Sequence, residues 1–182
     1  LFAAFSKDEN WGPAAVIDTA RAALPRNGVI SVDTGAHRIL LSQQWQSFGP
    51  RQIIQSTALC TMGVALPLAI GHKLANPDVP VLAFTGDAGL EMILGELATA
   101  RDKKLALPVN VFVDEQLALI ELKQRYDEMA NLGVEFGATD FAAVAYAMGG
   151  HGVTVSDRDS LTSAIESAFG AKTFTVIACP IG

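Results

Sequence analysis

Short apolar runs alternate with longer segments of helical periodicity along almost the entire chain. Each run has the length and composition of a buried strand and is followed by Gly, Pro, Ser or Asp. We therefore expect strands at residues 29–32, 52–55, 81–85, 109–113, 152–155 and 173–179. Between them, apolar residues recur every three or four positions, which predicts helices at 11–24, 38–45, 61–74, from 90 onward, and at 117–127, 140–148 and 157–169.

This alternation of strands and helices predicts an α/β fold. We expect a single three-layer domain in which a mostly parallel sheet is covered by helices on both faces. A chain of 182 residues is long enough for one domain with a full core. Residues 1–10 are expected to form an irregular lead-in and residues 128–137 a loop.

Composition and charge exclude several classes of protein. Half of the residues are hydrophobic and 18% are charged, which is typical of a globular rather than a disordered chain. The net charge of −6 argues against general nucleic-acid binding, which needs a basic face. No apolar run is long enough for a membrane span. Cys60 and Cys179 lack metal-type spacing, which favours a reduced, cytoplasmic chain.

The stretch from residue 81 to 116 contains the strongest candidate site. Its first strand ends at Gly86-Asp87-Ala88-Gly89, and its second strand ends at Asp114, 27 residues after Asp87. Parallel strands joined by one helix usually lie side by side, so both carboxylates are expected at the same edge of the sheet. Two carboxylates beside a Gly-containing turn at a helix N-terminus suit a hard divalent cation that itself holds a phosphate.

Each of these acidic residues also has a simpler interpretation. Asp87 taken alone fits a helix N-cap about as well as a metal ligand, and Asp114 taken alone fits a solvated turn. Glu115 competes with Asp114 for the same role. We expect Asp87 at a strand end rather than in the core, and its pairing with Asp114 at the next strand end favours metal binding.

The stretch resembles the thiamine diphosphate motif of the acetolactate synthase and pyruvate decarboxylase superfamily. That motif is Gly-Asp-Gly, a connecting segment of this length, and Asn-Asn. The chain has Gly86-Asp87-Ala88 and Val113-Asp114 at these places, and residues 90–92 and 96–99 between them are also similar to the family. Ala88 and Val113-Asp114 depart from the motif, but Asp114 keeps an oxygen donor and adds one negative charge.

The resemblance implies a thiamine-diphosphate-binding fold in which Mg²⁺ holds the cofactor diphosphate. It implies that Asp87 and Asp114 bind the metal through their side chains, and Gln116 through its backbone carbonyl. The spacing from Asp87 matches the family better for Asp114 than for Glu115. The residues implied to contact the cofactor are Gly35, Ala36, His37, Cys60, Met62, Gly86, Asp87, Ala88, Gly89, Asp114, Gln116 and Leu117.

Two upstream segments also resemble parts of the family's cofactor site. His37 matches a position in the loop that contacts the cofactor diphosphate, and an imidazole can donate a hydrogen bond to a phosphate oxygen. Met62 matches the bulky apolar residue that supports the bent cofactor, and Cys60 stands where the family often has Gly. Taken alone, His37 would be interpreted as an exposed loop residue and Met62 as a core methionine.

The resemblance further implies that no catalytic residue lies in this chain. These enzymes activate the cofactor with a Glu on a separate pyrimidine-binding domain, generally from a partner subunit, and we find no such domain in the sequence. We therefore expect residues 1–182 to be one domain of a homo-oligomeric enzyme, as a fragment or a subunit, and to be inactive alone. The parent enzyme is expected to be a lyase or transferase that decarboxylates or joins 2-oxo acids. Leu119 and Ile120 either line the substrate side of the site or pack in the core.

The sequence leaves two alternative functions open. The chain fits the small subunit of a split 2-oxo acid decarboxylase, in which two chains divide the two domains. It also fits a binding module that holds a nucleotide or another phosphorylated ligand without catalysis, because a parallel sheet is equally suited to that function. Metal-independent affinity for a nucleotide would favour the module.

Overall fold

The computed structural model describes residues 10–181, so the lead-in expected at residues 1–10 lies almost wholly outside the described residues. The strands are β1 (Val29–Val32), β2 (Ile53–Gln55), β3 (Val81–Gly86), β4 (Pro108–Val113), β5 (His151–Thr154) and β6 (Thr175–Pro180). The helices are α2 (Pro13–Ala23), α3 (Ala36–Gln44), α4 (Ala65–Ala75), α5 (Asp87–Glu91), α6 (Glu96–Asp102), α7 (Ala118–Tyr126), α8 (Phe141–Ala147) and α9 (Arg158–Phe169).

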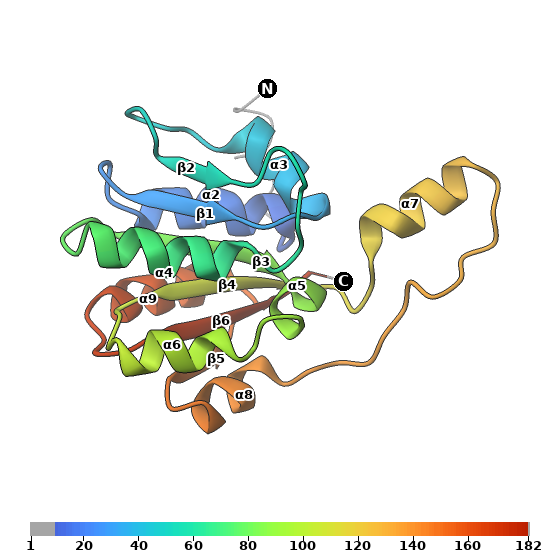
Figure 1. Ribbon diagram of the computed structural model, residues 1–182. Coiled ribbons are helices and arrows are strands. Elements are labelled where there is room, and N and C mark those ends of the chain that lie inside the picture. Colours follow the sequence, from blue (N-terminus) through green and yellow to red (C-terminus); the bar gives the residue numbers. More distant parts are fainter. Residues whose placement is uncertain (1–9, 182) are drawn as a thin grey trace.

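The strands of the described residues form one sheet in the order β2-β1-β3-β4-β6-β5, and each neighbouring pair is parallel (Figure 1). β3 and β4 are direct neighbours, with Phe84 opposite Asn110 and Gly86 opposite Phe112. The carboxyl ends of β1, β3 and β4 therefore meet at one edge, which we call the carboxyl edge. The α/β fold with a parallel sheet is confirmed. None of the helices within residues 10–181 is long and apolar enough to cross a membrane.

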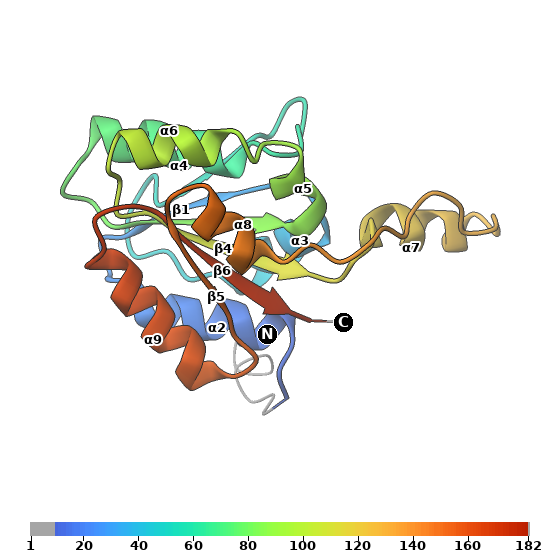
Figure 2. The same ribbon diagram turned by 90° about the horizontal axis from the view of Figure 1, so that it is seen from below.

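Helices cover both faces of the sheet, as the sequence predicts. Figure 2 shows α4 and α6 above the sheet and α2 and α9 below it. α8 packs against β5 and β6, whereas α3 packs against α2 at the other end of the sheet order.

The central strands send alternate side chains into two cores. Val81 and Ala83 of β3 pack with α4, α6 and α8, whereas Leu82 and Phe84 pack with α2 and α9. All four side chains are fully buried. Burial on both faces explains why β3 reads as a continuous apolar run rather than an alternating one.

Two helices begin at different residues from those that the sequence predicted. α3 begins at Ala36, so His37 lies in its first turn rather than in a loop. α4 begins at Ala65 instead of residue 61, because the backbone at Gly63 has a φ of +80° that an α-helix does not contain. The four preceding residues therefore form a loop.

The single helix expected after residue 89 is divided into two. α5 begins directly at Asp87 and ends at Glu91, and α6 begins at Glu96. Between them, the N–H of Ile93 bonds to the carbonyl of Leu90, and the N–H of Glu96 to the carbonyl of Ile93. These tighter i to i+3 bonds form turns that redirect the chain without changing which face is apolar.

Residues 115–138 form an arm that projects from the carboxyl edge, with α7 along its length (Figure 1). The two sides of the arm meet at its base, where the N–H of Leu117 donates to Val134 and the N–H of Phe136 donates to Glu115. No residue of α7 is buried. The arm is thus anchored at its base while its outer part makes no core.

The contact between β5 and α8 gives a test of the fold. At Gly152 a Cβ would lie 2.3 Å from the carbonyl oxygen of Ala142. We expect Gly152→Ala to lower the free energy of unfolding by about 1–3 kcal/mol, because backbone atoms must shift. Urea denaturation measures this change.

Gly71→Ala is the matched control, because a Cβ at this α4 position meets nothing within 4 Å. Alanine is favoured over glycine inside a helix by about 1 kcal/mol, so this variant is expected to be more stable than the wild type. Equal effects of the two substitutions would contradict the close approach of β5 to α8.

Candidate functional site

A cavity of about 480 Å³ lies at the carboxyl edge, beside the ends of β3 and β4, the start of α3 and the base of the arm. Every residue that the resemblance implied to contact the cofactor lines this cavity. They are Gly35, Ala36, His37, Cys60, Met62, Gly86, Asp87, Ala88, Gly89, Asp114, Gln116 and Leu117. The fold therefore brings the four sequence segments together, while their contact with a cofactor stays a prediction.

The cavity is also lined by residues that the sequence did not indicate. Leu40 of α3, Phe112 of β4 and Ile181 after β6 all line it. They add apolar surface, and nothing in the local pattern separates them from ordinary core residues. Leu119 and Ile120 line the cavity as well, which favours the site over the core for both.

Asp87 is almost fully buried, with 3% of its surface exposed. Its Oδ1 accepts the N–H of Ala88 at 2.8 Å, and its Oδ2 accepts the N–H groups of Asp114 at 3.0 Å and Glu115 at 2.8 Å. Gly86, not Asp87, is the N-cap of α5. Asp87 thus joins the end of β3 to the end of β4, and the expectation that it lies outside the core was wrong.

Asp114 and Glu115 differ in exposure and in their relation to the cavity. Asp114 is half-buried and lines both the cavity and a separate hollow beside α8, whereas Glu115 is exposed and lines that hollow but not the cavity. Burial, and then the negative charge of Asp87, raise the pKa of Asp114 to about 6. The two carboxylates therefore repel each other, and a cation bound by both would remove that repulsion.

His37 packs into the wall of the cavity. Its ring stacks on the ring of Phe112 with centroids 5.3 Å apart. Burial lowers the pKa of His37 to about 4, although a hydrogen bond with the backbone of Asp33 acts in the opposite direction. The imidazole is therefore neutral near pH 7. Its Nε2 is buried without a partner among the described residues, so this nitrogen remains available to a ligand.

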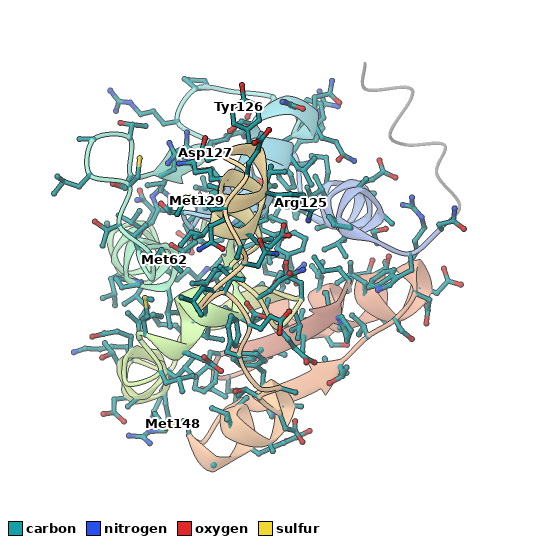
Figure 3. All side chains as sticks on the ribbon, turned by 90° about the vertical axis from the view of Figure 1, so that its right-hand side faces the viewer. Met62, Arg125, Tyr126, Asp127, Met129 and Met148 are labelled. Atoms are coloured by element: carbon teal, nitrogen blue, oxygen red, sulfur yellow. The ribbon has the colours of Figure 1, made fainter. Side chains whose placement is uncertain are left out.

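Cys60 and Met62 lie in the loop before α4. Figure 3 looks onto the carboxyl edge and shows Met62 near the start of α4. Met62 is half-buried and lines the cavity, so it is not a core methionine. Arg38 of α3 donates a hydrogen bond to the Sγ of Cys60 at 3.1 Å, which links α3 to the loop that carries Cys60 and Met62.

Asp33 lies at the end of β1, and the sequence did not indicate a role for it. It is fully buried, and its carboxylate accepts hydrogen bonds from residues of three segments. Burial raises the pKa of this carboxyl, while its hydrogen bonds act in the opposite direction. An acidic residue directly after a predicted strand was the available signal, as it was for Asp87 and Asp114.

The lining of the cavity suits a diphosphate only together with a cation. No Lys or Arg is among the described residues that line it, whereas Asp87 and Asp114 are. Within residues 10–181 no group of three or more His, Cys, Asp or Glu side chains could hold a metal ion. The third protein ligand would therefore be a backbone carbonyl, as Gln116 offers. Oxygen donors of this kind, completed by phosphate oxygens, are what Mg²⁺ prefers.

Comparison with known families matches residues 33–179 to the C-terminal TPP-binding domain of thiamine pyrophosphate enzymes. The chain belongs to this family. The acetolactate synthase isozyme 1 large subunit of Escherichia coli is 35% identical over 136 residues, which cover 74% of this chain and 24% of that protein. An acetolactate synthase of Bacillus subtilis is 27% identical over 175 residues, which cover 96% of this chain and 31% of that protein. The chain thus spans less than a third of the length of these two relatives.

The fold is also that of solved thiamine-diphosphate-dependent enzymes. The 4-hydroxybenzoylformate decarboxylase of Rhodococcus jostii RHA1 matches with a TM-score of 0.88 and 20% identity. The match covers 96% of this chain and 33% of that chain. The likeness at this level of identity supports the architecture alone.

The raised pKa of Asp114 predicts how the stability of the metal-free chain depends on pH. The folded chain holds this proton more tightly than the unfolded chain, whose aspartates titrate near pH 3.9. The stabilisation is fully present below about pH 4 and is lost as the pH rises through about 6. Asp114→Asn removes this titration.

In EDTA, we therefore expect the free energy of unfolding of Asp114→Asn to fall less than that of the wild type between pH 4.5 and pH 7. At pH 7 the variant is expected to be the more stable protein. Urea denaturation at the two pH values measures both. An identical pH dependence in the two proteins would contradict the burial and repulsion of Asp114.

Proposed function

We propose that this chain binds the diphosphate of thiamine diphosphate through Mg²⁺, as part of an acetolactate synthase-like enzyme that acts on 2-oxo acids. The reaction class is decarboxylation or carboligation, and the enzyme is accordingly a lyase or a transferase. The observation that carries the proposal is the convergence of four segments on one cavity, through residues 35–37, residues 60 and 62, residues 86–89, and residues 114, 116 and 117. Membership of the thiamine pyrophosphate enzyme family supports the identity of the cofactor.

Asp87 and Asp114 would hold the metal with the backbone carbonyl of Gln116. Asp87 is preorganised for this, because three backbone N–H groups fix both of its oxygens. Its hydrogen bonds to the N–H groups of Asp114 and Glu115 also set the position of the loop that carries the other two ligands. A single buried carboxylate would thus bind the metal and arrange the remaining ligands.

The other lining residues would bind the organic part of the cofactor. Met62 and Leu117 offer apolar surface, and Nε2 of His37 offers one polar contact without a protein partner. The cofactor, when bound, supplies the electron sink for the carbanion of the reaction. The apolar lining excludes water around it, which strengthens electrostatic interactions inside the cavity.

A pyrimidine-binding domain, from the same or a partner chain of a homo-oligomer, would complete the site. Two features of this structure support such a partner. Among residues 10–181, the acidic residues that line the cavity are Asp87 and Asp114, and both would be used for the metal, which leaves neither for cofactor activation. The arm beside the cavity also exposes large apolar side chains, among them Leu122, Tyr126 and Leu132. Exposed apolar surface of this kind often marks a protein interface.

Metal dependence is the direct test of the proposed function. Calorimetric titration with thiamine diphosphate is expected to show binding in Mg²⁺ and none in EDTA, because no basic side chain of the described cavity lining offsets the phosphate charge. Asp114→Ala removes one ligand and is expected to abolish binding in Mg²⁺. Ser160→Ala on α9 lies outside the cavity and is the control. Equal affinity with and without the metal would favour a metal-independent binding module instead.

Dependence on a partner domain is tested by turnover. The isolated chain is expected to release no CO₂ from a 2-oxo acid in the presence of thiamine diphosphate and Mg²⁺. Adding a pyrimidine-binding domain that carries the activating Glu is expected to restore decarboxylation. Substantial turnover by the chain alone, as a monomer in light scattering, would contradict the proposal that the site is shared.

A further inference from the structure

We infer that Asp33 is a positioning residue of the proposed cofactor site: it fixes the loop of residues 60–64 against the start of α5. The inference rests on the proposed function, because that loop carries Cys60 and Met62 and α5 begins with Asp87. Asp33 itself is not among the residues that line the cavity. It therefore acts through the segments that it joins and does not touch the cofactor.

The carboxylate of Asp33 accepts hydrogen bonds from three separate parts of the chain. Its Oδ1 accepts the N–H of Thr34 at 2.8 Å and the N–H of Val64 at 3.2 Å. Its Oδ2 accepts the N–H of Gly63 at 3.0 Å and the hydroxyl of Thr85 at 2.7 Å. Hydrogen bonds to an ionised acceptor are about twice as strong as neutral ones. One buried side chain thus connects the end of β1, the loop before α4 and the end of β3.

The packing around this carboxylate leaves no room for the segments to move closer. A Cβ at Gly89 would lie 2.6 Å from Oδ2 of Asp33 and 2.9 Å from Oγ1 of Thr85. A Cβ at Gly63 would lie 3.2 Å from the carbonyl oxygen of Gly89. The loop, the first turn of α5 and the Asp33 carboxylate are therefore in direct contact, and the position of each one depends on the other two.

The hydrogen-bond donors require a carboxylate at this position. The backbone partners of Asp33 are N–H groups, which can only donate, and an ionised carboxylate only accepts. In Asp33→Asn, the amide group would have to turn its own N–H₂ toward Gly63 or toward Val64. That donor pair cannot form a hydrogen bond, so the loop would shift away from α5.

Thr85 provides a second and milder way to weaken the same connection. Thr85→Val keeps the shape of the side chain but removes the hydroxyl that donates to Asp33. Thr85→Ser keeps the hydroxyl and is the conservative variant that should restore the effect. Thr85 does not line the cavity, so neither substitution removes a proposed cofactor contact.

Ser31→Ala is the matched control for a loss of stability alone. Ser31 lies in β1, is fully buried, and donates from its Oγ to the carbonyl of Ala65 at 2.7 Å. This hydrogen bond also connects β1 to the start of α4. It does not involve Asp33, and Ser31 does not line the cavity.

The experiment compares these variants of the full chain in its natural assembly. The affinity for thiamine diphosphate with Mg²⁺ is measured by calorimetry, and the melting temperature is measured without cofactor. We expect Asp33→Asn and Thr85→Val to weaken binding by about tenfold or more. In both variants the loop that carries Cys60 and Met62 would shift and lose its contacts with the cofactor, even when the fold is retained. Thr85→Ser is expected to bind like the wild type. Ser31→Ala is expected to lower the melting temperature and to keep its affinity.

Amide hydrogen exchange of the cofactor-free chain gives a readout that does not depend on binding. The N–H groups of Gly63 and Val64 are expected to exchange faster in Asp33→Asn and Thr85→Val, and at the wild-type rate in Ser31→Ala. Affinity that falls in step with the melting temperature in Thr85→Val and Ser31→Ala alike would overturn the inference. So would unchanged affinity in both Asp33→Asn and Thr85→Val.

The inference and the proposed function fail in different ways. A wild-type protein that binds no thiamine diphosphate contradicts the proposed function and overturns the inference together with it. Wild-type protein that binds the cofactor, while the Asp33 and Thr85 variants bind it equally well, overturns the inference alone.

Discussion

The structure depends on the parallel alignment of β1, β3 and β4, because it brings three aspartates to one edge of the sheet. Asp33, Asp87 and Asp114 follow these strands in turn, although 81 residues separate the first from the last. Two of them are buried and accept hydrogen bonds chiefly from backbone N–H groups. The remaining one, Asp114, faces the cavity. The sheet thus converts a sequence pattern into a compact acidic site.

The three carboxylates have two roles: they hold neighbouring segments together, and they place negative charge at the cavity. Asp33 and Asp87 connect neighbouring segments, and this fixes where the cavity walls lie. Asp87 and Asp114 also leave negative charge at the cavity that no Lys or Arg among its described lining residues offsets. The raised pKa of Asp114 reflects this arrangement. A divalent cation would remove the repulsion and would provide the positive charge that a diphosphate needs, so metal and phosphate are expected to bind together.

The sequence predicted the strands better than it predicted the helix ends. The central strands β3 and β4 are short, largely apolar runs, and the resemblance supplied residues that are distant in sequence but line one cavity. The start of α4 was missed because Gly63 has a positive φ that periodicity does not detect. Asp33 was missed because its role arises from partners in other segments. The burial of His37 was missed for the same reason, since it comes from packing on Phe112.

A crystal structure of the protein grown with thiamine diphosphate and Mn²⁺ tests the central claim most directly, because anomalous scattering locates the metal. The account predicts a single strong anomalous peak bonded to carboxylate oxygens of Asp87 and Asp114, to the carbonyl of Gln116 and to oxygens of the cofactor diphosphate. The diphosphate is expected to lie beside residues 35–37 and 86–89. A cofactor bound in this cavity without a metal at Asp87 and Asp114, or bound elsewhere on the chain, would contradict the account.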